Sequence, residues 1–279
     1  MNVKSDGALA VIPARWASTR FPGKPLADLV GRPMIEFVYR RTLRARLVSR
    51  ALVATDDERI MEAVKGFGGE AYMTSASHPS GTDRVAEVAE AHPDSGVIVN
   101  VQGDEPLIHP ADIDAALAPL LGDSEAKMTT IAVPVPGVED FLDPNVVKVV
   151  VDKEGDALYF SRAPVPHMRD LFGKAQASEA FLREAWEVIQ PRPLKHLGLY
   201  AYRREYLLRL ASLPPSPLEE AESLEQLRVL EDGARIRVVC IENDSIGVDV
   251  PEDLERLVTD SVLRSEIEQE IGLWPNTSL

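Results

Sequence analysis

Short apolar runs alternate with amphipathic stretches along the first part of the chain. The runs are rich in alanine, valine and isoleucine and have the length of buried strands, whereas the stretches between them repeat their apolar residues at helical spacing. This pattern predicts strands over residues 8–13, 50–55, 70–74 and 97–101, and helices over residues 33–47, 57–65, 84–91 and 111–121. Such alternation is typical of an α/β protein whose mostly parallel sheet is covered on both faces.

The rhythm changes after residue 127, where strands follow one another with few helices between them. The pattern predicts strands over 128–135, 146–152 and 156–160, a polar stretch with a helix over 178–189, a strand over 196–202, helices over 204–210 and 218–231, a strand over 235–240 and a helix over 251–272. We therefore expect a single α/β domain over residues 1–279, with a smaller β-rich lobe inserted at about 134–202 that carries substrate recognition or dimer contacts.

Charge and cysteine content narrow the class of protein. The net charge of −15 argues against nucleic acid as a partner, although a small polyphosphate can still bind where basic residues gather. Cys240 is the only cysteine, which excludes an intrachain disulfide and fits a reducing compartment. No apolar run approaches the roughly 18 residues that span a bilayer, and the run at 8–13 is too short for a signal peptide. We expect a cytoplasmic protein without membrane insertion.

The loop after the first predicted strand gathers basic residues. Arg15, Arg20 and Lys24 lie close together in sequence, along with the hydroxyls of Ser18 and Thr19. Clustered positive charge suits a polyphosphate, and ligands of parallel α/β sheets bind beyond the carboxyl ends of the strands. The spacing matches neither a Walker A loop nor a GxGxxG loop, and a solvated basic loop is the alternative interpretation.

Two aspartates also follow predicted strands. Asp104 comes after Gly103 at the end of the strand over 97–101, and Asp249 precedes a helix that starts with Pro251. If the two carboxylates meet, they would suit Mg²⁺, which keeps several waters and accepts phosphate oxygens. The alternative for Asp249 is a helix N-cap.

Residues 78–84, His-Pro-Ser-Gly-Thr-Asp-Arg, lie between a predicted strand and a predicted helix. Their small side chains could form a wall for a base and ribose. An ordinary capped helix start explains the same residues.

Taken in order, these segments resemble one family closely, the CMP-Kdo synthetases, or 3-deoxy-manno-octulosonate cytidylyltransferases (Kdo is 3-deoxy-manno-octulosonate). The matching stretches are IPARWASTRFPGKPLADLVGRPMIEFV, VATDDERI, HPSGTDRVAEV, VIVNVQGDEPLI, NVVKVVVDKEGDALYFSRAPVP, KHLGLYAYRREYL, SPLEEAESLEQLRVLEDG and GVDVPEDLERL. The resemblance implies a three-layer, Rossmann-like nucleotide-diphospho-sugar transferase fold, usually a homodimer. It also implies an enzyme that makes CMP-Kdo and pyrophosphate from CTP and Kdo for lipopolysaccharide.

The resemblance also implies roles for individual residues. Arg15 and Lys24 match the triphosphate-binding arginine and lysine, with Ser18 and Arg20 beside them, and Asp104 and Asp249 match the magnesium-binding aspartates. The segment at the cytidine end is matched by Ser80, Gly81 and Arg84. Positions on the sugar side are matched by Gln102, Ser161, Arg162, His196, Tyr200, Glu219, Glu222 and Gln226.

The expected reaction is direct displacement. The anomeric hydroxyl of the sugar acid attacks the α-phosphorus of CTP, with Asp104 and Asp249 holding magnesium and Arg15 and Lys24 stabilising the triphosphate. The planar guanidinium of Arg162 would suit the sugar carboxylate.

Two departures from the family pattern affect the acceptor side. Residues 167–195 form a longer and different segment, and Glu220-Ala221 stands where His-Ile is common. A related acceptor such as 8-amino-Kdo, a cytidylyltransferase for another acceptor, and a non-catalytic nucleotide-binding protein of the same fold are the alternatives.

Overall fold

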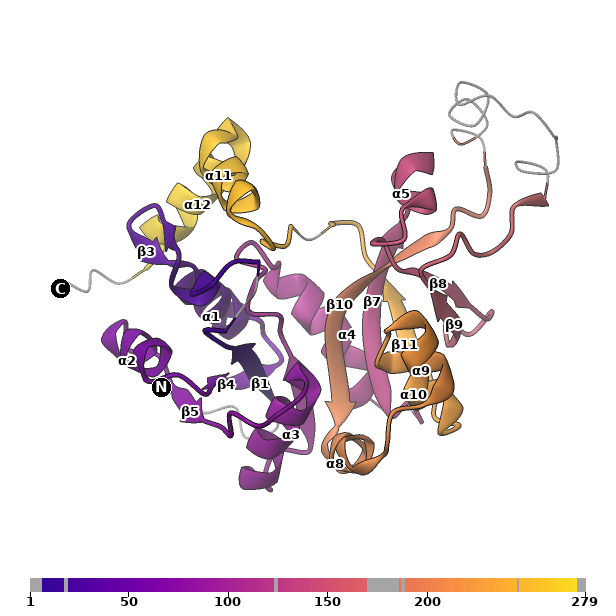
Figure 1. The fold of residues 1–279 in the computed structure, drawn as a ribbon, viewed down its shortest axis with the longest axis horizontal. Coiled ribbons are helices and arrows are strands. Elements are labelled where there is room, and N and C mark those ends of the chain that lie inside the picture. Colours follow the sequence, from indigo (N-terminus) through magenta and orange to yellow (C-terminus); the bar gives the residue numbers. More distant parts are fainter. Residues whose placement is uncertain are drawn as a thin grey trace.

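The structure is a computed structural model that describes residues 7–17, 20–122, 125–169, 186, 189–244 and 246–274. Its centre is a nine-stranded sheet (Figure 1). Seven strands form its main path in the order β11 (Ile236–Cys240), β7 (Met128–Pro134), β10 (Leu194–Arg203), β6 (Val97–Asn100), β1 (Ala8–Ala14), β4 (Val48–Thr55) and β5 (Ala71–Met73). Off this path, β8 (Lys148–Val151) pairs with β10, and β9 (Ala157–Ser161) pairs with β8.

Most neighbours along the main path run parallel, as the sequence predicts. The pairs β1–β4, β1–β6, β4–β5 and β11–β7 are parallel, whereas β10 is antiparallel to β6, β7 and β8. Strand β10 therefore lies between the two parallel parts of the sheet and joins them.

The strand β1 shows why helices cover both faces. Its side chains alternate, so Ala10 and Ile12 enter one apolar cluster, while Leu9 and Val11 enter another. The first cluster includes residues of α1 (Met34–Arg44), α2 (Glu58–Gly66) and α4 (Pro110–Leu121). The second includes residues of α3 (Gly81–Ala91), α8 (Arg204–Ser212) and α10 (Gln226–Glu231). The three-layer α/β fold predicted from the sequence is confirmed.

Two predicted helices are each interrupted. The helix predicted over 218–231 is two helices, α9 (Pro217–Glu222) and α10, because Ser223 takes a left-handed conformation with φ 51°. The helix predicted over 251–272 is α11 (Pro251–Thr259) and α12 (Ser261–Gly272). Asp260 separates them and caps α12 by accepting from the N–H groups of Val262 and Leu263.

Four short elements in the described part of the chain were not predicted, because each is too brief to show a period. They are the 3₁₀ helix η1 (Lys24–Leu26), the small hairpin of β2 (Asp28–Leu29) and β3 (Arg32–Pro33), and the helix α5 (Val138–Leu142). The helix predicted over 178–189 falls mostly outside the described residues.

The C-terminal helices return to the N-terminal half of the chain. In Figure 1, α11 and α12 lie beside α1. A third apolar cluster joins them, with Phe37 of α1, Leu257 of α11 and Ile267 of α12 all buried in it. This packing brings residues near 249, at the start of α11, back to the loops that follow β1 and β6.

Candidate functional site

A basic pocket lies beyond the carboxyl ends of β1 and β6. The residues that line it come from three loops and the start of α3, and they are Pro13, Ala14, Arg15, Ala17, Arg20, Lys24, Pro25, Gly81, Arg84, Gln102, Gly103, Asp104 and Asp249. The pocket thus gathers four cationic side chains and two carboxylates. All the predicted nucleotide-binding residues line it except Ser80, which lines the neighbouring pocket, and Ser18, which lies outside the described residues.

The two predicted metal carboxylates meet at one cationic atom. Lys24 Nζ lies 2.7 Å from Asp104 Oδ2 and 3.5 Å from Asp249 Oδ1, although 145 positions separate the two aspartates (249 − 104). Arg20 forms a fork with Asp249, at 3.1 and 3.2 Å. The side chains of Asp104 and Asp249 are 34% and 53% exposed, so a ligand can reach both.

Asp249 does not cap the helix that follows it. The N-terminus of α11 is capped instead by Asp253, whose Oδ2 accepts from the backbone N–H groups of Asp249 and Val250 at 2.8 and 3.0 Å. The N-cap interpretation of Asp249 is therefore wrong, and its carboxylate points to Arg20 and Lys24 instead.

Backbone contacts fix the loops that carry these groups. Val248 donates its N–H to the carbonyl of Asp104 at 2.9 Å, and Val248's own carbonyl accepts from Lys24 Nζ at 2.7 Å. Gly103 is needed for a close approach, since a Cβ built there would lie 2.6 Å from the carbonyl oxygen of Pro13. Any larger residue would push the Asp104 loop away from β1.

Arg84 is a buried cation at the wall of the pocket. It is only 2% exposed, and its guanidinium donates to Asp56 Oδ2 at 2.8 Å and to Thr74 Oγ1. Because the guanidinium is both buried and hydrogen-bonded, the side chain is held in one orientation. Ser80 caps α3 by accepting from the N–H of Asp83, so the capped-helix interpretation of residues 78–84 is correct. Residues 80–84 of this segment also line the two pockets.

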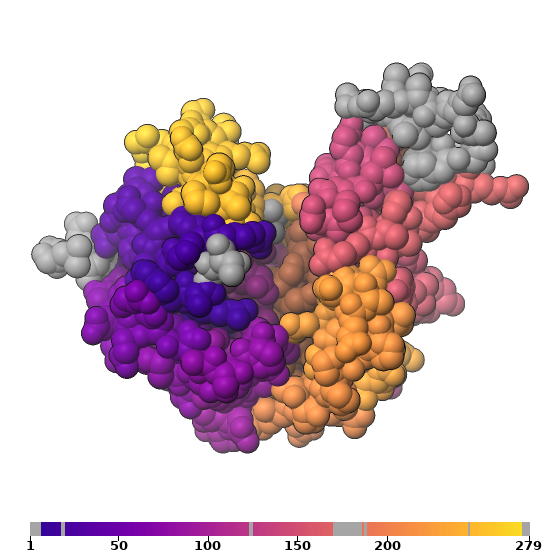
Figure 2. Space-filling model, viewed as in Figure 1, coloured from indigo at the N-terminus to yellow at the C-terminus, as the bar shows by residue number. Residues whose placement is uncertain are grey.

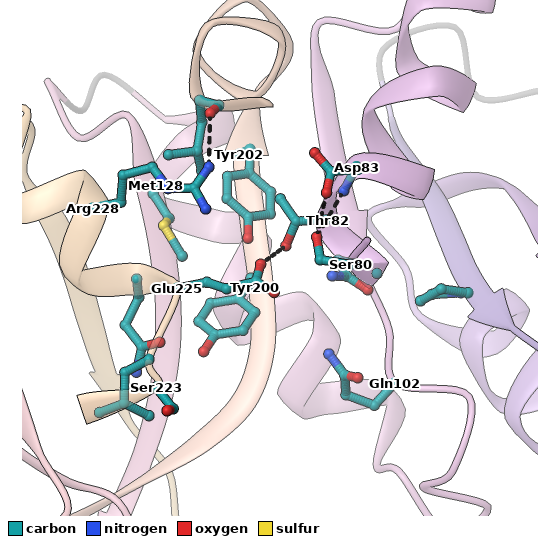
Figure 3. Close-up of a pocket in the computed structure, with 16 residues that line it drawn as sticks. Ser80, Thr82, Asp83, Gln102, Met128, Tyr200, Tyr202, Ser223, Glu225 and Arg228 are labelled. Atoms are coloured by element: carbon teal, nitrogen blue, oxygen red, sulfur yellow. Dashed lines mark hydrogen bonds between the residues drawn. The ribbon is translucent and has the colours of Figure 1, made fainter. Parts of the chain in front are cut away.

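A second pocket adjoins the first and shares Pro13, Gly81 and Gln102 with it. Figure 3 shows that it lies between the start of α3 on one side and the α9–α10 connection on the other. Hydroxyls, amides and carboxylates dominate its lining, which also includes Ser80, Thr82, Asp83, Asn100, Met128, Tyr200, Tyr202, Leu210, Ser223, Leu224, Glu225, Gln226 and Arg228. Figure 2 shows the surface hollowed between the corresponding two halves of the molecule.

One hydrogen bond crosses this second pocket. Thr82 of α3 donates to Glu225 Oε2 at 2.6 Å, joining the two sides (Figure 3). The sequence singled out Thr82 only as part of the 78–84 segment. It missed Glu225, and it missed Asn100, which ends β6 two positions before Gln102. The position of Asn100 at a strand end is a signal that could have identified it.

Of the predicted sugar-side residues, Gln102, Tyr200 and Gln226 line the second pocket. Gln102 Nε2 donates to the carbonyl of Gly198 at 2.8 Å, which fixes the amide beside β10. Burial raises the pKa of Tyr200, so its phenol stays protonated and can donate. Gln226 is 4% exposed and its Nε2 has no hydrogen-bond partner within the described part of the chain.

A hydrogen-bonded cluster lies beside this pocket. It consists of Ser161, Arg162 and Glu222, none of which is among the lining residues. Glu222 accepts from Ser161 Oγ at 2.6 Å and from the Arg162 N–H at 2.9 Å. The Arg162 guanidinium donates to the carbonyls of Glu222, Ser223 and Pro144. In this structure the cluster holds the α9–α10 connection in place.

Glu219 is engaged in a similar way. It completes the capping box of α9 with Ser216 and forms a two-point ion pair with Arg228 of α10. Burial opposes ionisation of Glu219, but the Arg228 contact and the hydrogen bond from the Ser216 N–H together outweigh it and lower the pKa of the carboxyl. The ion pair orients Arg228, which lines the second pocket.

His196 is buried behind the pocket. Its Nε2 lies 2.9 Å from Thr130 Oγ1, and its ring is next to those of Phe160 and Tyr200. Burial lowers the pKa of the imidazole to about 3, so the ring is neutral at neutral pH. Because the Thr130 hydroxyl donates to Leu199 O at 2.8 Å, it can accept from the imidazole N–H.

The basic pocket lies at strand ends of a three-layer α/β fold, holds two converging carboxylates and adjoins a polar pocket. This combination is typical of a nucleotidyltransferase. The model of the cytidylyltransferase family matches residues 9–236. The chain belongs to the 3-deoxy-manno-octulosonate cytidylyltransferases within that family, as the following likenesses show.

Among the relatives that carry that name are proteins from two Geobacter species. The protein from Geobacter metallireducens is 58% identical over 251 residues, which cover 89% of this chain and 95% of the relative. The protein from Geobacter sulfurreducens is 55% identical over 249 residues, covering 89% and 97%.

Solved structures agree. A CMP:2-keto-3-deoxy-manno-octonic acid synthetase complexed with CTP matches with a TM-score of 0.81 and 42% identity, over 95% of this chain and 99% of the other. A cytidylyltransferase from Leptospira borgpetersenii, 16% identical with a TM-score of 0.57 over 98% of both chains, shows the fold alone. In the described part of the chain, no helix is both long and apolar enough to cross a membrane.

Proposed function

We propose that the protein transfers the cytidylyl group of CTP to Kdo, giving CMP-Kdo and pyrophosphate. The observation that carries the proposal is the pair of adjoining pockets with Gln102 at their shared wall. The basic pocket suits a triphosphate and the polar pocket suits a polyhydroxylated acid. The names of the relatives supply the identities of both substrates.

The chemistry follows from this arrangement. The anomeric C2 hydroxyl oxygen of Kdo forms a bond to the α-phosphorus of CTP, the bond from that phosphorus to the bridging oxygen breaks, and pyrophosphate leaves with the electron pair while the hydroxyl proton is released. Arg15, Arg20 and Lys24 stabilise the charge on the triphosphate and the leaving group, and buried Arg84 supports that wall of the pocket. Gln102 lies where the two substrates would meet.

Magnesium fits the donor set of the basic pocket. Asp104 and Asp249 already share one cation, Lys24 Nζ, so their oxygens point to a common place. The residues that the structure describes contain no cluster of three or more metal-ligating side chains, which suits an ion that takes its other ligands from phosphate and water. When bound, the ion would neutralise phosphate charge and lower the pKa of the attacking hydroxyl. Arg20 and Lys24 would then exchange the carboxylates for phosphate oxygens.

We further propose that the enzyme works as a homodimer in the cytoplasm and supplies lipopolysaccharide biosynthesis. The resemblance across the chain supports these assignments. Light scattering of the purified protein measures the dimer directly, and a monomer at micromolar concentration would contradict it.

Pyrophosphate release tests the reaction. The purified protein is assayed with each of four nucleoside triphosphates and with Kdo, 8-amino-Kdo, a sialic acid and methylerythritol phosphate, with and without Mg²⁺. The proposal expects release only with CTP, Kdo and the metal together. Release with a different acceptor would correct the substrate, and CTP binding without release in any mixture would support a non-catalytic protein.

A further inference from the structure

The indole of Trp16 lies inside the basic loop and has no assigned role. Its neighbours in sequence, Arg15 and Ala17, line the basic pocket, but Trp16 itself is not among the lining residues. The ring contacts Arg59 on α2 and Gly23 at the other end of the loop. The loop therefore folds over its own tryptophan.

The indole of Trp16 packs closely against Gly23. A Cβ built on Gly23 would lie 2.8 Å from Cη2 and 3.0 Å from Cζ2 of the indole, and the residue has φ +72°. Both the close approach and the left-handed backbone favour glycine. The Gly23 N–H also donates to the Trp16 carbonyl at 3.0 Å, which closes the loop at its base. The next residue, Lys24, begins η1 and carries the ammonium of the site.

The contact with Arg59 is a stacked cation. The guanidinium carbon lies 3.4 Å from the centroid of the Trp16 ring, well within the range of a cation–π interaction. Asp57 holds that guanidinium in place through Nε at 2.9 Å and Nη2 at 2.6 Å. The Arg59 contact lowers the pKa of the Asp57 carboxyl, so the carboxylate stays ionised at neutral pH.

Asp57 is itself fixed at the junction of β4 and α2. It caps α2 by accepting from the Arg59 N–H at 3.0 Å, and its own N–H donates to Thr55 Oγ1 at 3.2 Å. A continuous series of contacts therefore links the sheet to the loop, from Asp57 through Arg59 and Trp16 to Gly23.

We propose that Trp16 and Arg59 are positioning residues for the triphosphate: the indole, held between the Arg59 guanidinium and the Gly23 backbone, keeps Arg15 and Lys24 in place for phosphate. The inference rests on the proposed function for its ligand, CTP. Neither residue touches the substrate. Their effect is on nucleotide affinity, because a loop that is ordered beforehand loses less conformational entropy on binding.

The test compares Arg59→Met, Arg59→Lys and Trp16→Leu with wild type. Arg59→Met keeps the length of the side chain but removes the stacked cation, and Arg59→Lys restores a cation. Arg50→Met is the matched control, because Arg50 is an exposed arginine that donates to Glu70 from the same two nitrogen atoms, Nε and Nη2, outside both pockets. CTP binding is measured by calorimetry without sugar, and KM and kcat are measured by pyrophosphate release.

We expect Arg59→Met to weaken CTP binding and raise the KM for CTP about three- to fivefold, as expected for an exposed cation–π contact. The KM for the sugar acid and kcat should stay within about twofold, Arg59→Lys should recover most of the loss, and Arg50→Met should match wild type. Trp16→Leu should weaken CTP binding about tenfold, and adding Arg59→Met to it should cause little further loss, since both remove one contact.

Three results would overturn the inference. Unchanged CTP affinity in Arg59→Met and Trp16→Leu would show that the loop is positioned without them. A change in preference between CTP and UTP in Trp16→Leu would show that the indole touches the base. Failure of the wild-type protein to bind CTP would show that CTP is not the ligand of this loop. By contrast, wild-type protein that binds CTP but releases no pyrophosphate would contradict the proposed function, while the calorimetry still decides the role of Trp16 and Arg59.

Discussion

At the scale of single residues, the site depends on two carboxylates that face the same cation. Asp104 and Asp249 both contact Lys24 Nζ, and Arg20 forms a second ion pair with Asp249. These ion pairs are partly exposed and contribute little to stability, about 0–1 kcal/mol each. In the proposed function, these pairs hold opposite charges ready for a metal ion and a triphosphate.

Replacing either carboxylate should therefore affect catalysis much more than stability. We expect Asp104→Asn and Asp249→Asn each to lower kcat/KM about 100-fold or more, as loss of a charge that stabilises a transition state does. The unfolding midpoint should change little. Asp244→Asn is the control, because Asp244 forms a similar ion pair with Lys195 and lines neither pocket. Near-normal turnover in both site variants would refute the metal assignment.

A second residue-scale prediction concerns pH. Burial lowers the pKa of His196 from 6.5 to about 3, so in acid the unfolded chain binds a proton that the folded protein does not. The free energy of unfolding should thus fall as the pH drops from about 6.5 towards 3, by about 1.4 kcal/mol per pH unit. His196→Gln should lack this component.

Urea unfolding at pH 7.5, 6.0 and 5.0 measures the difference. By pH 5.0 wild type should have lost about 2 kcal/mol more than His196→Gln. Other groups, such as Asp112, whose pKa is raised by burial, titrate in both proteins and cancel in the comparison. His92→Gln serves as control, because His92 is only partly buried. Parallel pH profiles for wild type and His196→Gln would show that the imidazole is solvated.

At the scale of elements, the break between α9 and α10 shapes the polar pocket. Ser223 reverses the chain there, and Leu224, Glu225 and Gln226 then line the pocket. Arg162 supports this connection by donating to the carbonyls of Glu222 and Ser223. The sequence predicted a role for Arg162 at the sugar carboxylate, and the structure suggests an additional way in which it can affect the sugar.

We expect Arg162→Ala to lower the free energy of unfolding by about 2 kcal/mol, because three backbone carbonyls lose their donor. The KM for the sugar acid should rise as the connection shifts, and the KM for CTP should not. Unfolding curves and two-substrate kinetics measure both effects, with Arg264→Ala on the exposed face of α12 as control. A rise confined to the KM for CTP would contradict both roles of Arg162.

The same elements show what could be predicted from the sequence. The basic loop and the loop that carries Asp104 each directly follow a strand, so local pattern and strand order placed them correctly. The bonding of Arg162 depends on a helix break at Ser223, and no helical period reveals a left-handed serine. Likewise, the ion pairs of Arg20 with Asp249 and of Arg84 with Asp56 join residues that meet only in the folded chain.

At the scale of the whole molecule, the segment that leads into the C-terminal helices completes the basic pocket, which the N-terminal half otherwise builds. Asp249 lies two positions before Pro251, the first residue of α11, and α12 follows after Asp260. The two helices are held on α1 by a buried apolar cluster and by Glu270, which pairs with Arg41 and Arg44. The position of Asp249 thus depends on packing some distance from the site.

A substitution that weakens the packing of α12 on α1 should make the position of Asp249 less fixed, although no residue that lines the basic pocket is changed. Ile267 of α12 is fully buried, so Ile267→Ala should lower the free energy that holds α11 and α12 on the rest of the fold by about 2–4 kcal/mol. Val262→Ala on the same helix is the control, since Val262 is 73% exposed. We expect faster amide hydrogen exchange in α11 and α12 of the Ile267 variant, together with weaker binding of CTP in the presence of Mg²⁺. If exchange accelerated but CTP affinity stayed at the wild-type value, Asp249 would be positioned by its contacts with Arg20 and Lys24 alone, independently of the helices that follow it.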